Sequence, residues 1–114
     1  MNLVEERPWG KYEVLLDSKD VKVKKITVSP KHRLSYQYHH KRQEQWVIVS
    51  GNLTIMLDGQ KVFKAPGESI FIPLGSQHRV WNETEKDVLF IEVQTGTYFG
   101  EDDIVRLSDD YKRS

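Results

Sequence analysis

The sequence predicts an all-β domain, folded as a closed barrel or a two-sheet jelly roll, and three observations support this. Turn-forming residues recur at short intervals, at Ser50-Gly51-Asn52, Asp58-Gly59, Pro66-Gly67 and Pro73-Leu74-Gly75. β-Branched and aromatic residues fill the segments between these turns. No segment shows the apolar periodicity of a long amphipathic helix. A chain of many short strands fits an architecture that leaves no long exposed sheet edge.

The strands follow from the alternation of apolar and polar residues between these turns. We expect them at 11–16, 21–28, 33–39, 44–49, 53–57, 61–65, 69–72, 77–82 and 88–94. The clearest hairpin joins 53–57 to 61–65 through Asp58-Gly59, because these two residue types tolerate the positive φ of a two-residue turn. Alternation changes phase between Val23 and Ile26, so we expect a bulge or a crossing between sheets there.

Length sets the domain organisation. The 114 residues and 13.4 kDa predict one domain over 1–114, with a barrel core at about 11–97. The charged stretch 100–114 is expected to pack as an irregular tail against the barrel or a partner chain. Its apolar anchors are Ile104, Val105, Leu107 and Tyr111.

Composition excludes several classes of protein. No apolar run exceeds four residues, so we expect neither a membrane span nor a signal peptide, and a cytoplasmic location follows. The 17 basic and 17 acidic residues balance, which argues against a nucleic-acid binder. The absence of cysteine removes thiolate chemistry, so a metal ion must be held by nitrogen and oxygen.

The balanced net charge conceals two segregated segments. Residues 19–42 hold eight Lys or Arg and one Asp, whereas residues 83–110 hold nine Asp or Glu and two Lys or Arg. Two interpretations are open: solvated faces that attract one another, or an anionic small-molecule site near the basic segment.

A polar strand face is the first sign of a functional site. Arg33, Ser35, Gln37 and His39 alternate with apolar neighbours, so on a strand they project from one face. Glu44 begins the next predicted strand and can return beside His39. Imidazole, carboxylate and amide oxygen suit Zn, Mn, Fe, Co or Ni.

The spacing of these residues resembles the two motifs of the cupin superfamily. Gln37-x-His39-x4-Glu44-x6-Gly51 matches the first motif, with Gln in place of its first histidine. The second motif is met in full by Gly67, Pro73, Gly75, His78 and Asn82. The resemblance implies a single-domain cupin, a double-stranded β-helix or jelly-roll barrel. It also implies that Gln37, His39, Glu44 and His78 hold a divalent metal ion, with Zn placed before Mn, Co, Ni or Fe.

A narrower resemblance covers nearly the whole chain. The segments 7–10, 33–35, 37–46, 49–51, 91–96 and 100–106 are similar to the type II mannose-6-phosphate isomerase domain, which usually follows a mannose-1-phosphate guanylyltransferase. Lys41 and Gln45 stand where that family commonly has histidines. The resemblance implies metal-dependent isomerisation of mannose 6-phosphate to fructose 6-phosphate.

That reaction gives roles to several further residues. The developing oxyanion of an enediol-like intermediate needs electrostatic stabilisation, which Arg33 supplies if it faces the pocket, unless it serves only a structural ion pair. Arg33 is also a candidate for holding the phosphate, together with Lys31 and Lys41. Glu92, His40 and Glu44 remain open as the general base, because spacing cannot show reach.

Two other functions compete with the isomerase. A regulatory cupin could bind a sugar or sugar nucleotide without turnover, and His39, Glu44 and His78 also supply the two-His-one-carboxylate set of a non-haem iron dioxygenase. The expected partners are a small-molecule sugar phosphate and a second copy of the chain in a homodimer, with no nucleic acid and no membrane.

Overall fold

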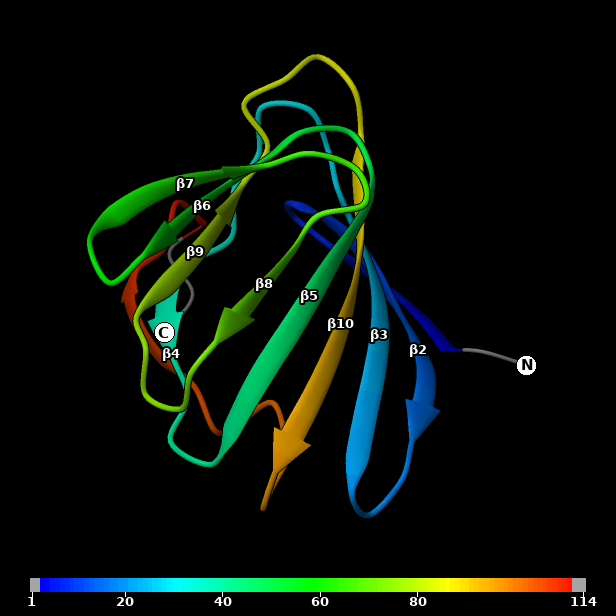
Figure 1. Ribbon diagram of the computed structural model, residues 1–114, viewed down its shortest axis with the longest axis vertical. Coiled ribbons are helices and arrows are strands. Elements are labelled where there is room, and N and C mark those ends of the chain that lie inside the picture. Colours follow the sequence, from blue (N-terminus) through cyan, green and yellow to red (C-terminus); the bar gives the residue numbers. More distant parts are fainter. Residues whose placement is uncertain (1–2, 112–114) are drawn as a thin grey trace.

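The chain folds into two antiparallel sheets that face one another (Figure 1). The computed structural model describes residues 3–111, which contain no helix and therefore none that could span a membrane. The first sheet holds six strands in the order β1 (Leu3–Arg7), β2 (Gly10–Asp17), β3 (Val21–Val28), β10 (Val88–Gly96), β5 (Arg42–Ser50) and β8 (Ser69–Ile72). The second holds five in the order β11 (Val105–Ser108), β4 (Tyr36–Tyr38), β9 (His78–Trp81), β6 (Leu53–Leu57) and β7 (Gln60–Lys64).

The β6–β7 hairpin forms as predicted. Asp58 and Gly59 have φ values of 47° and 83°, and the positive φ of both residues matches the twist of the two strands. Leu53 and Ile55 of β6 are buried in the core.

Interior positions change from apolar to polar along the central strands. On β10, Val88 and Phe90 are fully buried in the core, whereas Glu92 and Gln94 continue the same inward row. Their cross-strand neighbours change in step: Phe90 pairs with Ile26 of β3, and Glu92 pairs with Lys24. One end of the barrel is therefore a hydrophobic core, and the other is a buried polar site.

The register explains the phase change within β3. Pairing of β3 with β10 is continuous, so β3 itself carries no bulge; the irregularity lies on β2, between Val14 and Leu16. The inward row of β3 is Lys24, Ile26 and Val28, all buried. A buried lysine takes the place where alternation predicts an apolar residue.

The observed strands differ from the predicted ones in three ways. Strand 33–39 is regular only over Tyr36–Tyr38, because Arg33 makes a single isolated bridge to Trp81. Alternation did not predict β1, which adds an edge strand before the predicted core. The tail is not irregular throughout: Val105–Ser108 forms β11 and extends the second sheet beside β4.

Candidate metal centre

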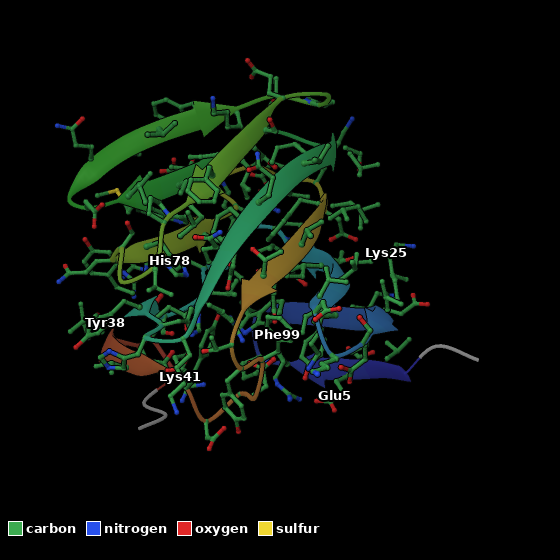
Figure 2. The ribbon with its side chains drawn as sticks, turned by 60° about the horizontal axis from the view of Figure 1, so that its bottom comes forward. Glu5, Lys25, Tyr38, Lys41, His78 and Phe99 are labelled. Atoms are coloured by element: carbon green, nitrogen blue, oxygen red, sulfur yellow. The ribbon has the colours of Figure 1, made fainter. Side chains whose placement is uncertain are left out.

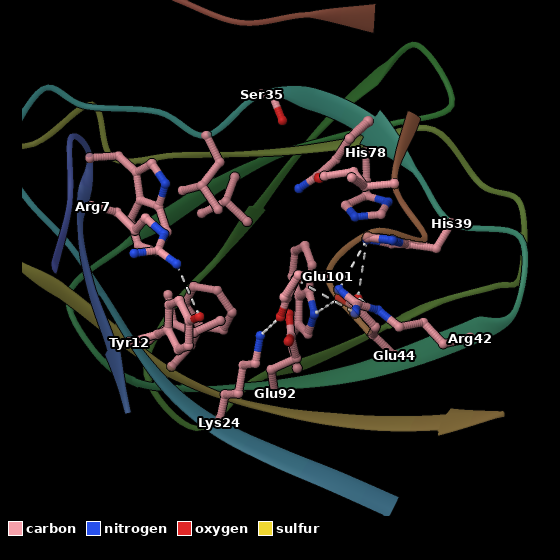
Figure 3. A pocket seen from close by; sticks show the side chains of 18 of the residues that line it. Arg7, Tyr12, Lys24, Ser35, His39, Arg42, Glu44, His78, Glu92 and Glu101 are labelled. Atoms are coloured by element: carbon pink, nitrogen blue, oxygen red, sulfur yellow. Dashed lines mark hydrogen bonds and ion pairs between the residues drawn. The ribbon is translucent and has the colours of Figure 1, made fainter. Parts of the chain in front are cut away.

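Three side chains converge at the polar end of the barrel. His39 directly follows β4, Glu44 lies on β5 and His78 begins β9. One ligand atom from each lies within 4.8 Å of the others, and all three residues are at least 97% buried. They line a cavity of about 120 Å³, drawn in Figure 3. His39, Glu44 and His78, which the sequence motifs place together, thus lie close to one another inside the barrel.

Backbone carbonyls orient both imidazole rings. His39 Nδ1 lies 2.5 Å from the Asp103 carbonyl oxygen, and His78 Nδ1 lies 3.0 Å from the Ser76 carbonyl oxygen. Because a carbonyl only accepts, each Nδ1 donates its proton and each Nε2 carries the lone pair. The lone pair of His39 accepts from Arg42 Nη2 at 3.2 Å, so this donor must give way to an ion. Burial lowers the pKa of His39 to about 4 and also lowers the pKa of His78, so both rings are neutral at pH 7.

Gln37 supplies a test of whether this cluster fits a metal ion. It pairs with His78 across β4 and β9 and lines the same cavity. Its side-chain oxygen is buried and has no hydrogen-bond partner among the described residues. An orphaned carbonyl oxygen beside two imidazoles and a carboxylate suits a borderline or hard divalent ion. The donor set of Gln37, His39, Glu44 and His78 therefore fits the metal that the motifs imply.

Neighbouring donors hold the Glu44 carboxylate in place. Trp46 Nε1 donates to its Oε1 at 2.8 Å, and Arg42 Nε donates to its Oε2 at 2.9 Å. The same Oε2 lies 3.6 Å from His39 Nε2. Arg42 also places Nη2 3.2 Å from His39 Nε2, so one guanidinium contacts two of the candidate ligands.

Glu92 is the second carboxylate in the cavity. It is 6% exposed, and Gln94 Nε2 donates to it at 2.6 Å. Burial, reinforced by the nearby charge of Glu44, raises the pKa of Glu92 to about 7. At neutral pH this group is poised to take up or release a proton.

Four of the sequence-predicted residues lie outside the cavity lining. Arg33 pairs with Asp110 through Nε at 2.7 Å and Nη2 at 2.9 Å, and it does not line the cavity. The expectation that it faces the pocket fails because the regular strand begins only at Tyr36. Lys31 forms an ion pair with Glu85.

His40 and Lys41 lie on the turn before β5, also outside the cavity. His40 is exposed and its ring contacts Tyr38 edge-on. The Lys41 ammonium lies 5.2 Å from the Tyr98 ring centroid, at the end of the barrel seen in Figure 2.

Sequence reasoning missed the basic and acidic groups that do line the cavity. They are Arg7, Lys24, Arg42, Glu101 and Arg106. The one available signal was Lys24, whose even position continues the inward row of β3. Glu101 and Arg106 belong to the tail, and their approach depends on the docking of β11, which no local pattern predicts.

The sequence comparisons all point to one family. A profile of the family described as "Mannose-6-phosphate isomerase C-terminal" matches residues 3–109. A mannose-1-phosphate guanylyltransferase of Escherichia coli K12 is 44% identical over 107 residues, covering 94% of this chain and 22% of that protein. The alginate biosynthesis protein AlgA of Pseudomonas aeruginosa is 44% identical over 108 residues, covering 95% of this chain and 22% of that protein. The chain thus spans about a fifth of the length of these curated relatives.

Solved structures confirm the fold. The capsular polysaccharide assembling protein CapF of Staphylococcus aureus superposes with a TM-score of 0.84 at 19% identity, over 95% of this chain and 34% of that one. A cupin 2 conserved barrel domain protein of Salinispora arenicola superposes with a TM-score of 0.68 at 21% identity, over 75% of this chain and 74% of that one. At these identities the likeness concerns the fold alone. The predicted cupin fold is confirmed.

Proposed function

This chain belongs to the family of mannose-6-phosphate isomerase C-terminal domains, and on that premise we propose that it interconverts mannose 6-phosphate and fructose 6-phosphate with a bound divalent metal ion. One observation carries the proposal: the cavity holds a four-residue donor set and, beside it, a buried carboxylate of raised pKa. Gln37, His39, Glu44 and His78 would hold the ion. When bound, the ion would polarise the sugar oxygens and lower the cost of an enediolate.

The chain's own groups account for the proton movements. The aldose-to-ketose step removes a proton from C2 of mannose 6-phosphate and delivers one to C1, while the hydroxyl proton on O2 is lost and one is gained on O1. We assign the carbon-to-carbon transfer to Glu92, because a pKa of about 7 lets it both accept and donate near neutral pH. His40 does not line the cavity, and Glu44 is held by Trp46 and Arg42.

The direct test measures metal content and turnover in the same samples. The purified chain is stripped with a chelator, reloaded separately with Zn, Mn, Co, Ni or Fe, and assayed for fructose 6-phosphate formed from mannose 6-phosphate. We expect stripping to abolish turnover and at least one metal to restore it. His78→Ala should lower bound metal and turnover together. Unchanged metal content in this variant contradicts the ligand set, and metal-loaded protein that binds but does not convert mannose 6-phosphate indicates a binding module instead.

Two further proposals concern the setting of this chain. A homodimer is supported by exposed apolar side chains on the outward faces of β5 and β8, namely Val47, Val49 and Phe71. Light scattering of the purified chain tests it, and a mass of one chain at all concentrations contradicts it. A cytoplasmic location is supported by the bacterial sugar-metabolism enzymes among the relatives.

A further inference from the structure

The cavity contains two buried cations. Neither the metal ion nor the proton transfer requires Lys24, and Arg42 holds Glu44 through Nε but has no hydrogen-bond partner for Nη1 among the described residues. Lys24 is 4% exposed and Arg42 is 5% exposed, and both line the cavity. Lysine and arginine are almost never buried without a partner, because removing their charge from water costs several kcal/mol. A partner that both side chains share would indicate the kind of anion that this part of the cavity holds.

Arg42 pairs most closely with Glu44 at 2.9 Å, and the partner that it shares with Lys24 is Glu101, from the segment after β10. Its carboxylate forms an ion pair with Lys24, and its Oε2 lies 3.9 Å from Arg42 Nη1. Burial alone would raise the pKa of Glu101, but Lys24 and Arg42 hold it below its ordinary value. The Glu101 side chain is 46% exposed, so it can turn outward into water. The two cations are enclosed in the barrel and stay in place.

Glu101 leaves part of this cationic site unsatisfied. A separation of 3.9 Å is too long for a hydrogen bond, and Arg42 Nη1 is a buried donor without a hydrogen-bond partner among the described residues. A phosphate monoester carries up to two negative charges and three terminal oxygens. It can pair with Lys24 and also bond Arg42 Nη1, which one carboxylate does only in part.

Arg42 connects the Lys24–Glu101 pair to the candidate metal centre. Its Nε and Nη2 contact Glu44 and His39, whereas Nη1 is directed toward Glu101. Lys24 is fixed on the other side by the Tyr12 ring, whose centroid lies 4.3 Å from Nζ. Figure 3 shows the Lys24–Glu101 pair at the cavity, with Glu92 beside it. An anion held here lies next to the groups proposed to bind and isomerise the sugar.

We infer that Lys24 and Arg42 form the subsite for the phosphate group of the substrate, and that Glu101 is a built-in counter-ion which the phosphate displaces. The identification of the ligand as a sugar phosphate rests on the proposed function. The subsite itself requires only a phosphate monoester or inorganic phosphate.

Calorimetry with the chelator-treated protein tests the subsite without any metal or turnover. Inorganic phosphate and mannose 6-phosphate should bind the wild type, whereas mannose should not. Lys24→Met should weaken phosphate binding at least tenfold. The matched control is Lys25→Met, since Lys25 is the next residue on β3 and points outward to solvent (Figure 2), and its affinity should equal that of the wild type. Equal affinity of Lys24→Met and the wild type overturns the inference.

Glu101→Gln gives an independent and opposite expectation. Removing the competing charge should tighten phosphate binding several-fold, whereas a carboxylate that only braces the cavity would leave affinity unchanged or weaken it on removal. Either of those results overturns the inference that phosphate displaces Glu101. Circular dichroism checks that each variant folds, and Glu101→Gln decides the question if Lys24→Met does not fold.

The two proposals fail separately. Lys24-dependent phosphate binding without turnover by any metal-loaded form refutes the isomerase and keeps the subsite. Turnover with an unchanged phosphate affinity and an unchanged KM in Lys24→Met refutes the subsite and keeps the isomerase.

Discussion

Glu92 makes the stability of the metal-free protein depend on pH in a way that one substitution removes. Its pKa is about 7 in the folded chain and 4.5 when solvated. Below pH 4.5 the group is protonated in both states and contributes nothing. Between pH 4.5 and 7 only the folded state keeps the proton, so raising the pH favours unfolding, and above pH 7 the loss is complete.

The size of the effect follows from the two pKa values. The difference between the two pKa values corresponds to about 3 kcal/mol, most of which falls between pH 5 and pH 8. Glu92→Gln keeps the shape and can still accept from Gln94. Its unfolding free energy should therefore rise relative to the wild type by about 2 to 3 kcal/mol over this interval.

Urea unfolding with a chelator present, followed by tryptophan fluorescence at pH 5 and pH 8, measures this difference. The other groups around Glu92 are Lys24, Arg42 and Glu44, and they are the same in both proteins. His39 is also near Glu92, whose charge raises its pKa, but that pKa of about 4 lies below the measured interval. His39 is therefore neutral in both folded proteins at pH 5 and pH 8, and its contribution to the difference is small.

Glu85→Gln is the matched control, because the Glu85 side chain is 83% exposed and water solvates its charge in both states. Its difference from the wild type should not change with pH. A constant difference for Glu92→Gln as well would refute the burial argument.

Three other substitutions test separate parts of the structure. Asn82→Ala should destabilise the fold by about 3 kcal/mol, because Asn82 is fully buried and donates to two carbonyl oxygens at 2.7 and 2.8 Å. Denaturant titration measures this loss, and a loss under ~1 kcal/mol contradicts the prediction. Gly96→Ala should cost at least about 2 kcal/mol, since Gly96 has a φ of 148° and a new Cβ would lie 2.3 Å from the Lys41 carbonyl oxygen; an unchanged melting temperature would show that the backbone there is free to move. Arg33→Leu should leave metal and phosphate affinities unchanged and should lower the unfolding free energy by at most ~1 kcal/mol, because the Arg33–Asp110 pair is partly exposed and lies outside the cavity. A tenfold loss of phosphate affinity would restore Arg33 as a phosphate ligand.

Sequence patterns predicted which side chains point inward where they lie on regular strands. Glu44, Trp46 and Ile48 alternate inward on β5, and the motif spacing brings His78 to the same place. The prediction for Arg33 failed because alternation has no meaning beyond the end of a regular strand.

The remaining groups could not be predicted from local pattern. Lys24 is buried only because Tyr12 and Glu101, the latter 77 residues away, surround its ammonium group. The chain's segregated charge gave a hint of this, since Lys24 lies in the basic segment and Glu101 in the acidic one. Which of many possible pairs would form is decided by the closure of the barrel.

The contacts of Asp103 with the metal centre determine when during synthesis that centre can form. Its carbonyl oxygen fixes the His39 ring, and its carboxylate accepts from the amides of His40 and Lys41 at 3.1 and 2.9 Å. During synthesis on the ribosome these contacts cannot form until Asp103 has left the exit tunnel, long after both histidines have emerged. Nascent chains should therefore acquire high metal affinity only after residue 103 has emerged, which delays capture of a wrong ion by an incomplete barrel.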